Sequence, residues 1–186
     1  MNIFDSLRST RSAQQSAVNW FTRNVKRLSK ISPAQLWQNR DNLVNNTQIG
    51  KMYMFYYDAK TKNELPYWDK FPLVIPIEPY SDGFLGMNFH YLKPKYRQTL
   101  LTQLLTLASD KNLGESTKIR ATYNLLNSGR KYKWFKPTIK RYLSKHVRSR
   151  FLMVDAKDWE MAILLPVERF QKASAKKVWE DSRSNV

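Results

Sequence analysis

Residues 71–91 read FPLVIPIEPYSDGFLGMNFHY, and this stretch decides the fold class. It contains a run rich in β-branched residues, 71–77, and a run rich in aromatic residues, 84–91, separated by a short polar segment with proline and glycine. Runs of this composition around a turn predict two antiparallel strands. Proline cannot donate a hydrogen bond to a strand ladder, so Pro72 and Pro76 indicate that the first strand is an edge strand or contains a bulge.

A third run of the same kind, residues 51–57, precedes this pair and completes a compact antiparallel meander. Residues 65–76, LPYWDKFPLVIP, concentrate aromatic rings and prolines. We interpret them as a tight loop that closes a small barrel, rather than as a binding platform, because large apolar side chains are usually buried. The order of strands and loops resembles small SH3-like barrels, including the PemK-type ribonucleases, at the level of the fold alone.

The residues before the strands have the pattern of helices. Apolar side chains at a three-four spacing predict an amphipathic helix over residues 3–30, and Arg11 and Gln14 interrupt its apolar stripe, which indicates a break there. Ser32 followed by Pro33 is typical of a helix start, and we expect this second helix to continue to about residue 44.

The C-terminal half mixes helices and strands. We expect helices over residues 94–109, 115–127 and 136–146, a pair of strands over 147–154 and 159–165, and a last short helix after residue 174. The overall class is α+β, a small antiparallel β meander or SH3-like barrel with flanking helices and an N-terminal helical arm. We divide the chain into a basic helical N-terminal arm (1–47), an α+β core with a basic helix-strand surface (48–167) and a C-terminal tail (168–186).

The charge balance points to an anionic partner. The 186 residues include 32 Lys and Arg but 15 Asp and Glu, which gives a formal net charge of +17. A small domain needs a net charge of only about 2–8 for solubility, and a negative partner would relieve the self-repulsion of the excess. We favour nucleic acid as that partner, ahead of an acidic protein surface in an assembly and an anionic membrane surface. No apolar run approaches the roughly 20 residues of a membrane-spanning helix, so we expect no membrane span.

Several kinds of chemistry lack the residues that they need. Cysteine is absent, which excludes disulfides, thiolate metal sites and a cysteine nucleophile. His90 and His146 have no partner at metal-ligand spacing. Residues 58–60 and 155–157 are acid-x-Lys fragments of the kind found in some nucleases, but neither has a second carboxylate in a matching context. We therefore expect no catalytic residues, no metal and no cofactor.

The densest basic signal lies in residues 116–154, which contain no acidic residue. Aromatic residues are interleaved with the cations, a mixture in which Lys and Arg pair with phosphates while rings stack on bases. On a strand, Arg148 and Arg150 would project from one face. The alternative is that the apolar residues are core and the cations serve solubility. The candidate nucleic-acid-binding residues are Lys118, Arg120, Arg130, Lys131, Lys133, Trp134, Lys136, Lys140, Arg141, Lys145, Arg148 and Arg150.

The N-terminal helix provides a second candidate surface. We expect its apolar seam to pack in a groove of a neighbouring subunit, as an assembly arm, because a lone helix is marginal in water. A solvated helix surface is the alternative for its cations. The seam consists of Val18, Phe21, Val25 and Leu28, and the basic face beside it of Arg23, Lys26 and Arg27.

Four blocks of the sequence, residues 50–58, 65–76, 83–91 and 146–150, resemble a group of small proteins in large contractile-tailed phages of the T-even type. Members of this group are DNA end protectors or virion proteins without an assigned role. The resemblance implies a structural virion component that is made in the host cytoplasm and that touches the packaged DNA or its end. It supplies no catalytic residues.

Charge and resemblance together predict a non-enzymatic phage virion protein that binds DNA through its basic surface, protecting the packaged DNA end or sealing the portal, neck or tail channel. One alternative is a structural subunit of the phage neck, tail or baseplate that binds acidic neighbours among the other virion proteins. Another is a PemK-like or metal-dependent nuclease. We expect no membrane partner and no small-molecule substrate.

Overall fold

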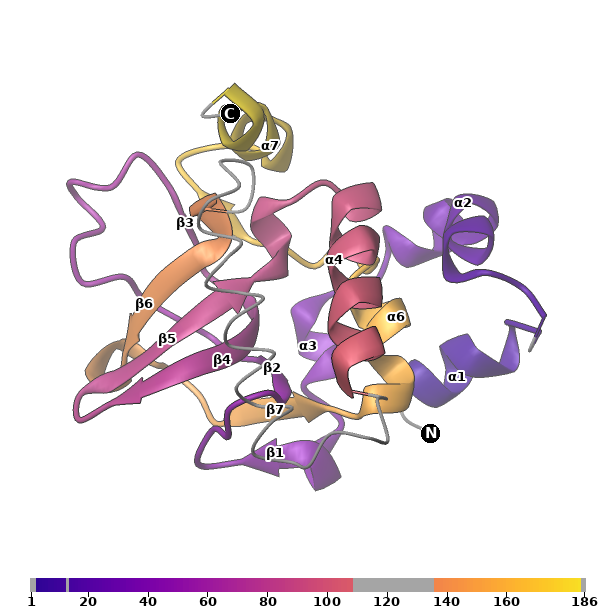
Figure 1. The fold of residues 1–186 in the computed structure, drawn as a ribbon, viewed down its shortest axis with the longest axis horizontal. Coiled ribbons are helices and arrows are strands. Elements are labelled where there is room, and N and C mark those ends of the chain that lie inside the picture. The colour runs from indigo at the N-terminus through magenta and orange to yellow at the C-terminus, as the bar shows by residue number, and fades with distance from the viewer. Residues whose placement is uncertain (1–2, 13, 109–135, 185–186) are drawn as a thin grey trace.

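The computed structural model describes residues 3–12, 14–108 and 136–184. Its centre is an antiparallel sheet with most helices to one side (Figure 1). The strands of this sheet, in spatial order, are β1 (Leu43–Val44), β7 (Phe151–Val154), β2 (Met52–Met54), β4 (Leu73–Tyr80), β5 (Gly83–Asn88) and β6 (Ile139–Leu143). A separate antiparallel pair is formed by β3 (Trp68–Asp69) and β8 (Phe170–Gln171).

The helices lie before, between and after these strands. The described α-helices are α1 (Ile3–Ser9), α2 (Ala17–Leu28), α3 (Pro33–Leu36), α4 (Pro94–Ala108), α6 (Trp159–Ala162) and α7 (Ala175–Ser184). The described 3-10 helices are η1 (Arg40–Asn42), η2 (Phe89–Tyr91), η3 (Lys136–Thr138), η4 (Ser144–His146) and η5 (Ala156–Asp158). Within the described ranges, no helix is long and apolar enough to span a bilayer.

The predicted α+β class is confirmed, and the sheet is open. Among the described strands, β1 and β6 are outermost and do not pair with each other. Tyr57 and Val147 form a single antiparallel bridge, so the segment after β6 meets the segment after β2 without a continuous ladder. The described residues therefore form no closed SH3-like barrel.

Side chains alternate between the two faces of the sheet, as the period of a strand requires. On β2, Met52 and Met54 join the main core under the helices, whereas Tyr53 points to an aromatic cluster on the opposite face. In that cluster the rings of Phe55 and Tyr142 meet edge to face, with centroids 5.3 Å apart. The sheet thus separates a helix-covered core from a smaller aromatic one.

The N-terminal segment is part of the main core. Arg8 pairs with Asp158 at 2.7 Å and Arg11 pairs with Glu160 at 2.8 Å, which ties this segment to the α6 region. The described part of residues 1–47, which we expected to be a separate arm, therefore packs in the main core beside the sheet. The residues of α1 and α2 buried in the main core are Phe4, Leu7, Ala17, Trp20 and Leu28.

Most predicted strands and helices are present, with shifted ends. The long N-terminal helix is broken as its interrupted stripe indicated, and α2 starts after Ser16, whose hydroxyl accepts a hydrogen bond from the Asn19 N–H at 3.2 Å. The run with Pro72 and Pro76 forms β4, which begins after Pro72 and is central rather than at an edge. The bulge is present, because the register of β4 with β5 shifts between Pro76 and Glu78. The helices predicted after Lys93 and Ser174 are confirmed as α4 and α7.

Three expected elements have a different structure. The helix predicted over 136–146 is β6 between two 3-10 turns, because its residues complete a ladder with β5. The strand predicted over 159–165 begins as α6; a short apolar run that is buried on all sides fits helix and strand equally well by pattern. The helix that begins after Ser32 ends at Leu36, and β1 follows instead. The helix predicted over 115–127 lies outside the described residues.

Candidate nucleic-acid interface

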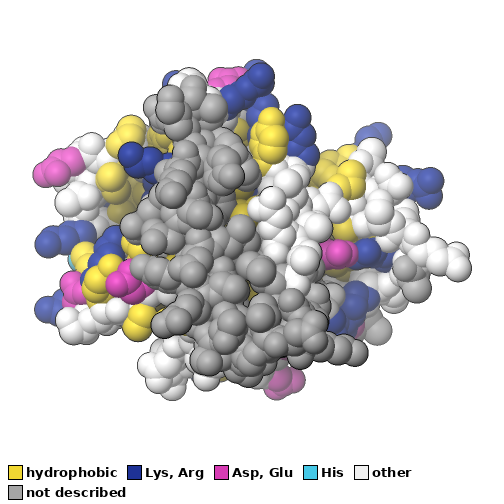
Figure 2. Space-filling model, viewed as in Figure 1, with side chains coloured by type: hydrophobic (Ala, Val, Ile, Leu, Met, Phe, Trp, Pro, Cys, Tyr) yellow, Lys and Arg dark blue, Asp and Glu magenta, His cyan; other side chains and the backbone are white. Residues whose placement is uncertain are grey.

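The basic residues expected to bind nucleic acid are described only in part. Lys118, Arg120, Arg130, Lys131, Lys133 and Trp134 lie outside the described residues, so their role stays a prediction. The others lie in η3, in β6 and in the segment between β6 and β7. They are Lys136, Lys140, Arg141, Lys145, Arg148 and Arg150. In Figure 2, Lys and Arg side chains are visible on the side of the molecule that β6 occupies in Figure 1, with acidic side chains among them.

The outermost strand β6 sets the directions of its two cations. Tyr142 is buried in the aromatic cluster, and Lys140, two residues earlier, lies on the same face of the strand. The ammonium of Lys140 stands 4.1 Å from the centroid of the Tyr91 ring. Burial lowers the pKa of Lys140 to about 8, because the ammonium has lost part of its water.

Arg141 is exposed on the other face of β6. Its guanidinium lies 3.9 Å from the centroid of the Tyr80 ring and also pairs with Asp82. Both partners come from the β4–β5 turn region, so this arginine is held in place against its own sheet. The positive charge of Arg141 is therefore partly neutralised by Asp82.

Arg148 and Arg150 precede β7 and were expected on one strand face. The strand begins only at Phe151, and the two arginines reach different neighbours. Arg148 lies 3.7 Å from the carboxylate of Asp58, whereas Arg150 donates to the side-chain oxygen of Asn45 at 3.1 Å. Arg150 therefore keeps an uncompensated charge in the described structure.

Lys136 and Lys145 are exposed at the two ends of β6, in η3 and η4. Neither makes an ion pair with an acidic side chain of the described residues. Together with Arg150 they are the exposed cations of this surface that are best placed to bind an external anion. We call Lys136, Lys145 and Arg150 the exposed basic triplet.

A cavity of about 340 Å³ adjoins β6. It lies between β6 and the loop that joins β2 to β3, with η2 contributing one side. Both Lys140 and Arg141 line it, and so does Trp68, whose buried indole N–H has no hydrogen-bond partner in the described part of the chain. We call this the β6 cavity.

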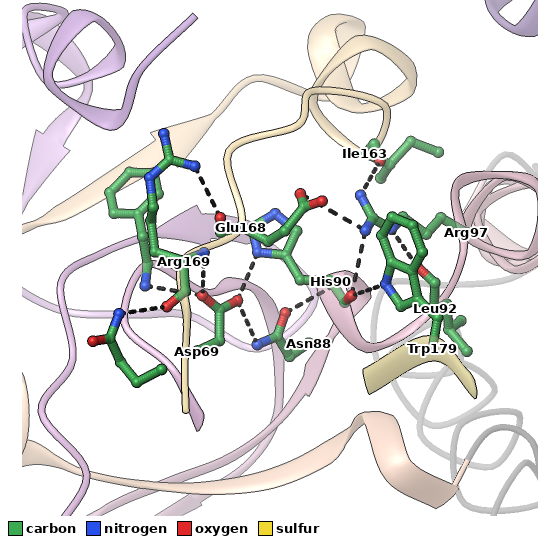
Figure 3. A network of polar contacts seen from close by, with 11 residues as sticks. Asp69, Asn88, His90, Leu92, Arg97, Ile163, Glu168, Arg169 and Trp179 are labelled. Carbon is green, nitrogen blue, oxygen red and sulfur yellow. Dashed lines mark hydrogen bonds and ion pairs between the residues drawn. The ribbon is translucent and has the colours of Figure 1, made fainter. Parts of the chain in front are cut away.

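A buried polar network lies near this cavity and was not predicted (Figure 3). Both oxygens of Asp69 are occupied: Oδ1 accepts from the N–H groups of Phe71 and Arg169 at 3.0 and 3.1 Å, and Oδ2 accepts from Asn88 at 3.2 Å. Nδ1 of His90 is 2.6 Å from the same Oδ2. The buried Asp69 carboxylate therefore has hydrogen-bond partners for both of its oxygens.

The network continues through the backbone of His90 to the helices. Its carbonyl accepts from Nη2 of Arg97 at 3.3 Å and from the indole N–H of Trp179 at 2.8 Å. Arg97 also donates to the carbonyls of Leu92 and Ile163, at 2.6 and 2.9 Å. These bonds join η2, α4, α6 and α7. Since His90 is 0% exposed, its pair with Asp69 lies within the folded core.

The expected assembly seam on α2 has a different orientation. Leu28 is fully buried and Phe21 is partly buried, but Val18 and Val25 are 37% and 44% exposed. Trp20 occupies the buried side of the helix instead. The cations expected beside the seam are all exposed, namely Arg23, Lys26 and Arg27.

In the described part of the chain, the two acid-x-Lys fragments lie apart, and Asp155 of the second one lines a cavity together with Asp5 and Asp41. Asp58 is paired with Lys62 at 3.0 Å, and Asp155 precedes η5 at a different place on the sheet. Within the described residues, no group of three or more acidic or histidine side chains is arranged to hold a metal ion.

The described residues form a small basic α+β domain with an open antiparallel sheet, and exposed Lys and Arg side chains flank its outermost strand β6. The comparison with protein families identifies it further. The family model of the Phage T4 terminal DNA protecting protein matches residues 3–182, and the chain belongs to this family. Comparisons with curated proteins and with solved structures gave no match. The phage resemblance seen in the sequence is thereby confirmed.

Proposed function

We propose that this protein binds the end of linear DNA in a phage particle and shields that end, acting by occupancy and without catalysis. The family match over residues 3–182 carries the proposal. A net charge of +17 supports it, because phosphates are the anions that such an excess of Lys and Arg binds most often.

The exposed basic triplet supports a contact to the DNA backbone. Lys136 and Lys145 bracket the outermost strand β6, and Arg150 lies near β1 at the other end of the strand order, so the three cations offer contacts to phosphates at separate places on the sheet. Backbone contacts of this kind fix a protein on DNA without reading its sequence. We therefore expect no sequence preference from these three residues.

Competition between DNA forms tests the proposal. A labelled linear duplex is bound to the full-length protein, and unlabelled competitors of equal sequence are added, either linear or closed at both ends by hairpin loops. Preferential displacement by linear DNA is the expected result. Equal displacement by both forms would leave general DNA binding and remove end recognition.

A protein that binds no DNA form in this assay would instead fit the alternative from the sequence, a neck, tail or baseplate subunit with acidic protein neighbours. Cleavage of the labelled DNA during incubation with magnesium or manganese would support the nuclease alternative instead.

A further inference from the structure

The β6 cavity is lined by side chains that suit a nucleotide base as well as a phosphate. Its walls carry aromatic side chains, which are the usual platforms for unpaired bases, because every base has a face that stacks on a ring. These side chains come from the loop before β3, from β3 itself, from η2 and from β6. The partly exposed rings are those of Tyr67 and Trp68, and the buried rings behind them are those of Tyr57, Tyr91 and Tyr142.

Positive charge is present at the same cavity. The Lys140 ammonium stands over the Tyr91 ring, and the exposed Lys60 also lines the cavity. Arg141 lines it too, but its guanidinium is held by Tyr80 and Asp82. Asp69 also lines it, but backbone N–H groups, an amide and an imidazole surround its carboxylate. An anion entering the cavity therefore meets lysine side chains rather than a free carboxylate.

The size of the cavity limits its occupant. A volume of about 340 Å³ lies at the lower end of the roughly 300–1,000 Å³ typical of ligand pockets. A double helix cannot enter such a space, whereas one unpaired nucleotide can. Bases inside an intact duplex would first have to be unstacked, but a terminal nucleotide frays readily.

We propose that the β6 cavity holds the terminal nucleotide of a DNA strand, with its base against the aromatic wall and its terminal phosphate beside Lys140. This inference rests on the proposed function and adds to it the group that is recognised. A terminal phosphomonoester carries a charge of about −1.5 to −2 at neutral pH, more than the single charge of an internal phosphodiester. A partly desolvated ammonium favours that extra charge, and the unpaired indole N–H of Trp68 lies in the same wall.

Binding of end-modified DNA tests the inference. Equilibrium affinity is measured for linear duplexes with a short overhang that carry either a 5′-phosphate or a 5′-hydroxyl, and for the same sequence closed by hairpin loops. The 5′-phosphate form should bind about tenfold more tightly than the 5′-hydroxyl form, a difference of about 1.4 kcal/mol. A 3′-phosphate on the same duplex shows whether the preference belongs to one strand end or to any terminal monoester.

Variants assign the preference to the cavity. Lys140→Met keeps the apolar stem and removes the charge, so the phosphate preference should disappear; Lys60→Met, at an exposed position, should reduce it and is a second test if the first variant folds poorly. Lys145→Met removes a cation outside the cavity lining and should weaken all linear forms equally, leaving the ratio unchanged.

Each outcome is decisive for the inference. Equal affinity for the 5′-phosphate, 3′-phosphate and 5′-hydroxyl forms overturns it, as does a preference that survives Lys140→Met in a folded protein. If these linear forms bind equally but better than closed DNA, end binding stands and only the cavity assignment fails. If closed DNA binds as well as every linear form, the proposed function fails too.

Discussion

Nδ1 of His90 lies 2.6 Å from Oδ2 of Asp69, and both side chains are almost completely buried. Burial by itself raises the pKa of the Asp69 carboxyl. The charge of His90 and hydrogen bonds from His90, the Arg169 N–H and Asn88 outweigh burial, and the pKa of Asp69 lies below its usual 3.8.

This pair predicts an acid-sensitive fold. A carboxyl whose pKa is lower in the folded state stabilises the fold above the unfolded pKa, and the stabilisation is lost as the pH falls through the folded value. Urea unfolding should therefore show stability falling below a pH of about 3.8. Asp69→Asn should cost about 3–5 kcal/mol at neutral pH, because it leaves buried partners uncompensated, and should flatten the acid dependence. An unchanged acid dependence in this variant would place the sensitive group elsewhere.

The binding of DNA ends should depend on pH through Lys140. Its pKa of about 8 means that the ammonium loses its proton as the pH rises past that value, and affinity for a 5′-phosphate end should fall with it. Fluorescence anisotropy across this range provides the measurement. The Lys140→Met variant should show a flatter profile, whereas a wild-type profile that stays flat would argue against contact between Lys140 and the phosphate.

Other groups around the cavity do not mask this titration. Burial is the main cause that raises the pKa of each lining tyrosine above 10, so these tyrosines stay neutral, while Asp69 stays ionised. The remaining charged lining residues are Lys60 and Arg141, and Arg141 is paired with Asp82. The tyrosines are Tyr57, Tyr67, Tyr91 and Tyr142.

The N-terminal helices should matter for stability. Trp20 is 0% exposed in the main core, so Trp20→Ala should lower the free energy of unfolding by about 3–5 kcal/mol. Val25→Ala on the exposed side of the same helix should change it by less than about 0.5 kcal/mol. Chemical denaturation of both variants checks this. Similar, small effects would mean that α2 is an independent arm, as the sequence first suggested.

A tight approach between β5 and β6 makes Gly83 sensitive. A Cβ atom added there would lie 1.9 Å from the carbonyl oxygen of Tyr142, and the residue has φ +156°. Gly83→Ala should cost about 1–3 kcal/mol or more. Gly50→Ala is the matched control, because Gly50 also has a positive φ, +78°, but its Cβ would meet nothing within 4 Å. If Gly50→Ala lowers the free energy of unfolding as much as Gly83→Ala does, the loss of stability comes from the positive φ and not from the contact with Tyr142.

The strands β2, β4 and β5 were predictable because the composition typical of a strand is visible in their own residues. Residues 51–57 and 84–91 are rich in aromatic residues and residues 71–77 in β-branched ones, and each range overlaps a strand. The segment 139–143 was misassigned, since its strand state depends on a ladder with β5, far away in the sequence. Tertiary pairing overrides local preference in such short segments.

The buried network could have been found only in part. Arg97 precedes Leu100 and Leu101 by one helical turn, so it lies on the apolar face of α4, and this was a signal for a buried cation. Its acceptors could not be foreseen, because the carbonyl of Ile163 is 66 residues away. The β6 cavity was unpredictable for the same reason: Lys140 was a candidate, but its ring partner Tyr91 comes from another element.

Protection of a DNA end from digestion tests the central claim most directly. An end-labelled linear duplex is exposed to an exonuclease with the wild-type protein, with a variant in which Lys136, Lys145 and Arg150 are changed to Gln, or with a control variant that loses equal charge at exposed cations of α2 and α7. The control changes Arg23, Lys26 and Lys176 to Gln. Wild type and control should delay digestion of the label, and the first variant should not. Equal protection by both variants would contradict a role for this surface, and a wild-type protein that gives no protection would contradict the account as a whole.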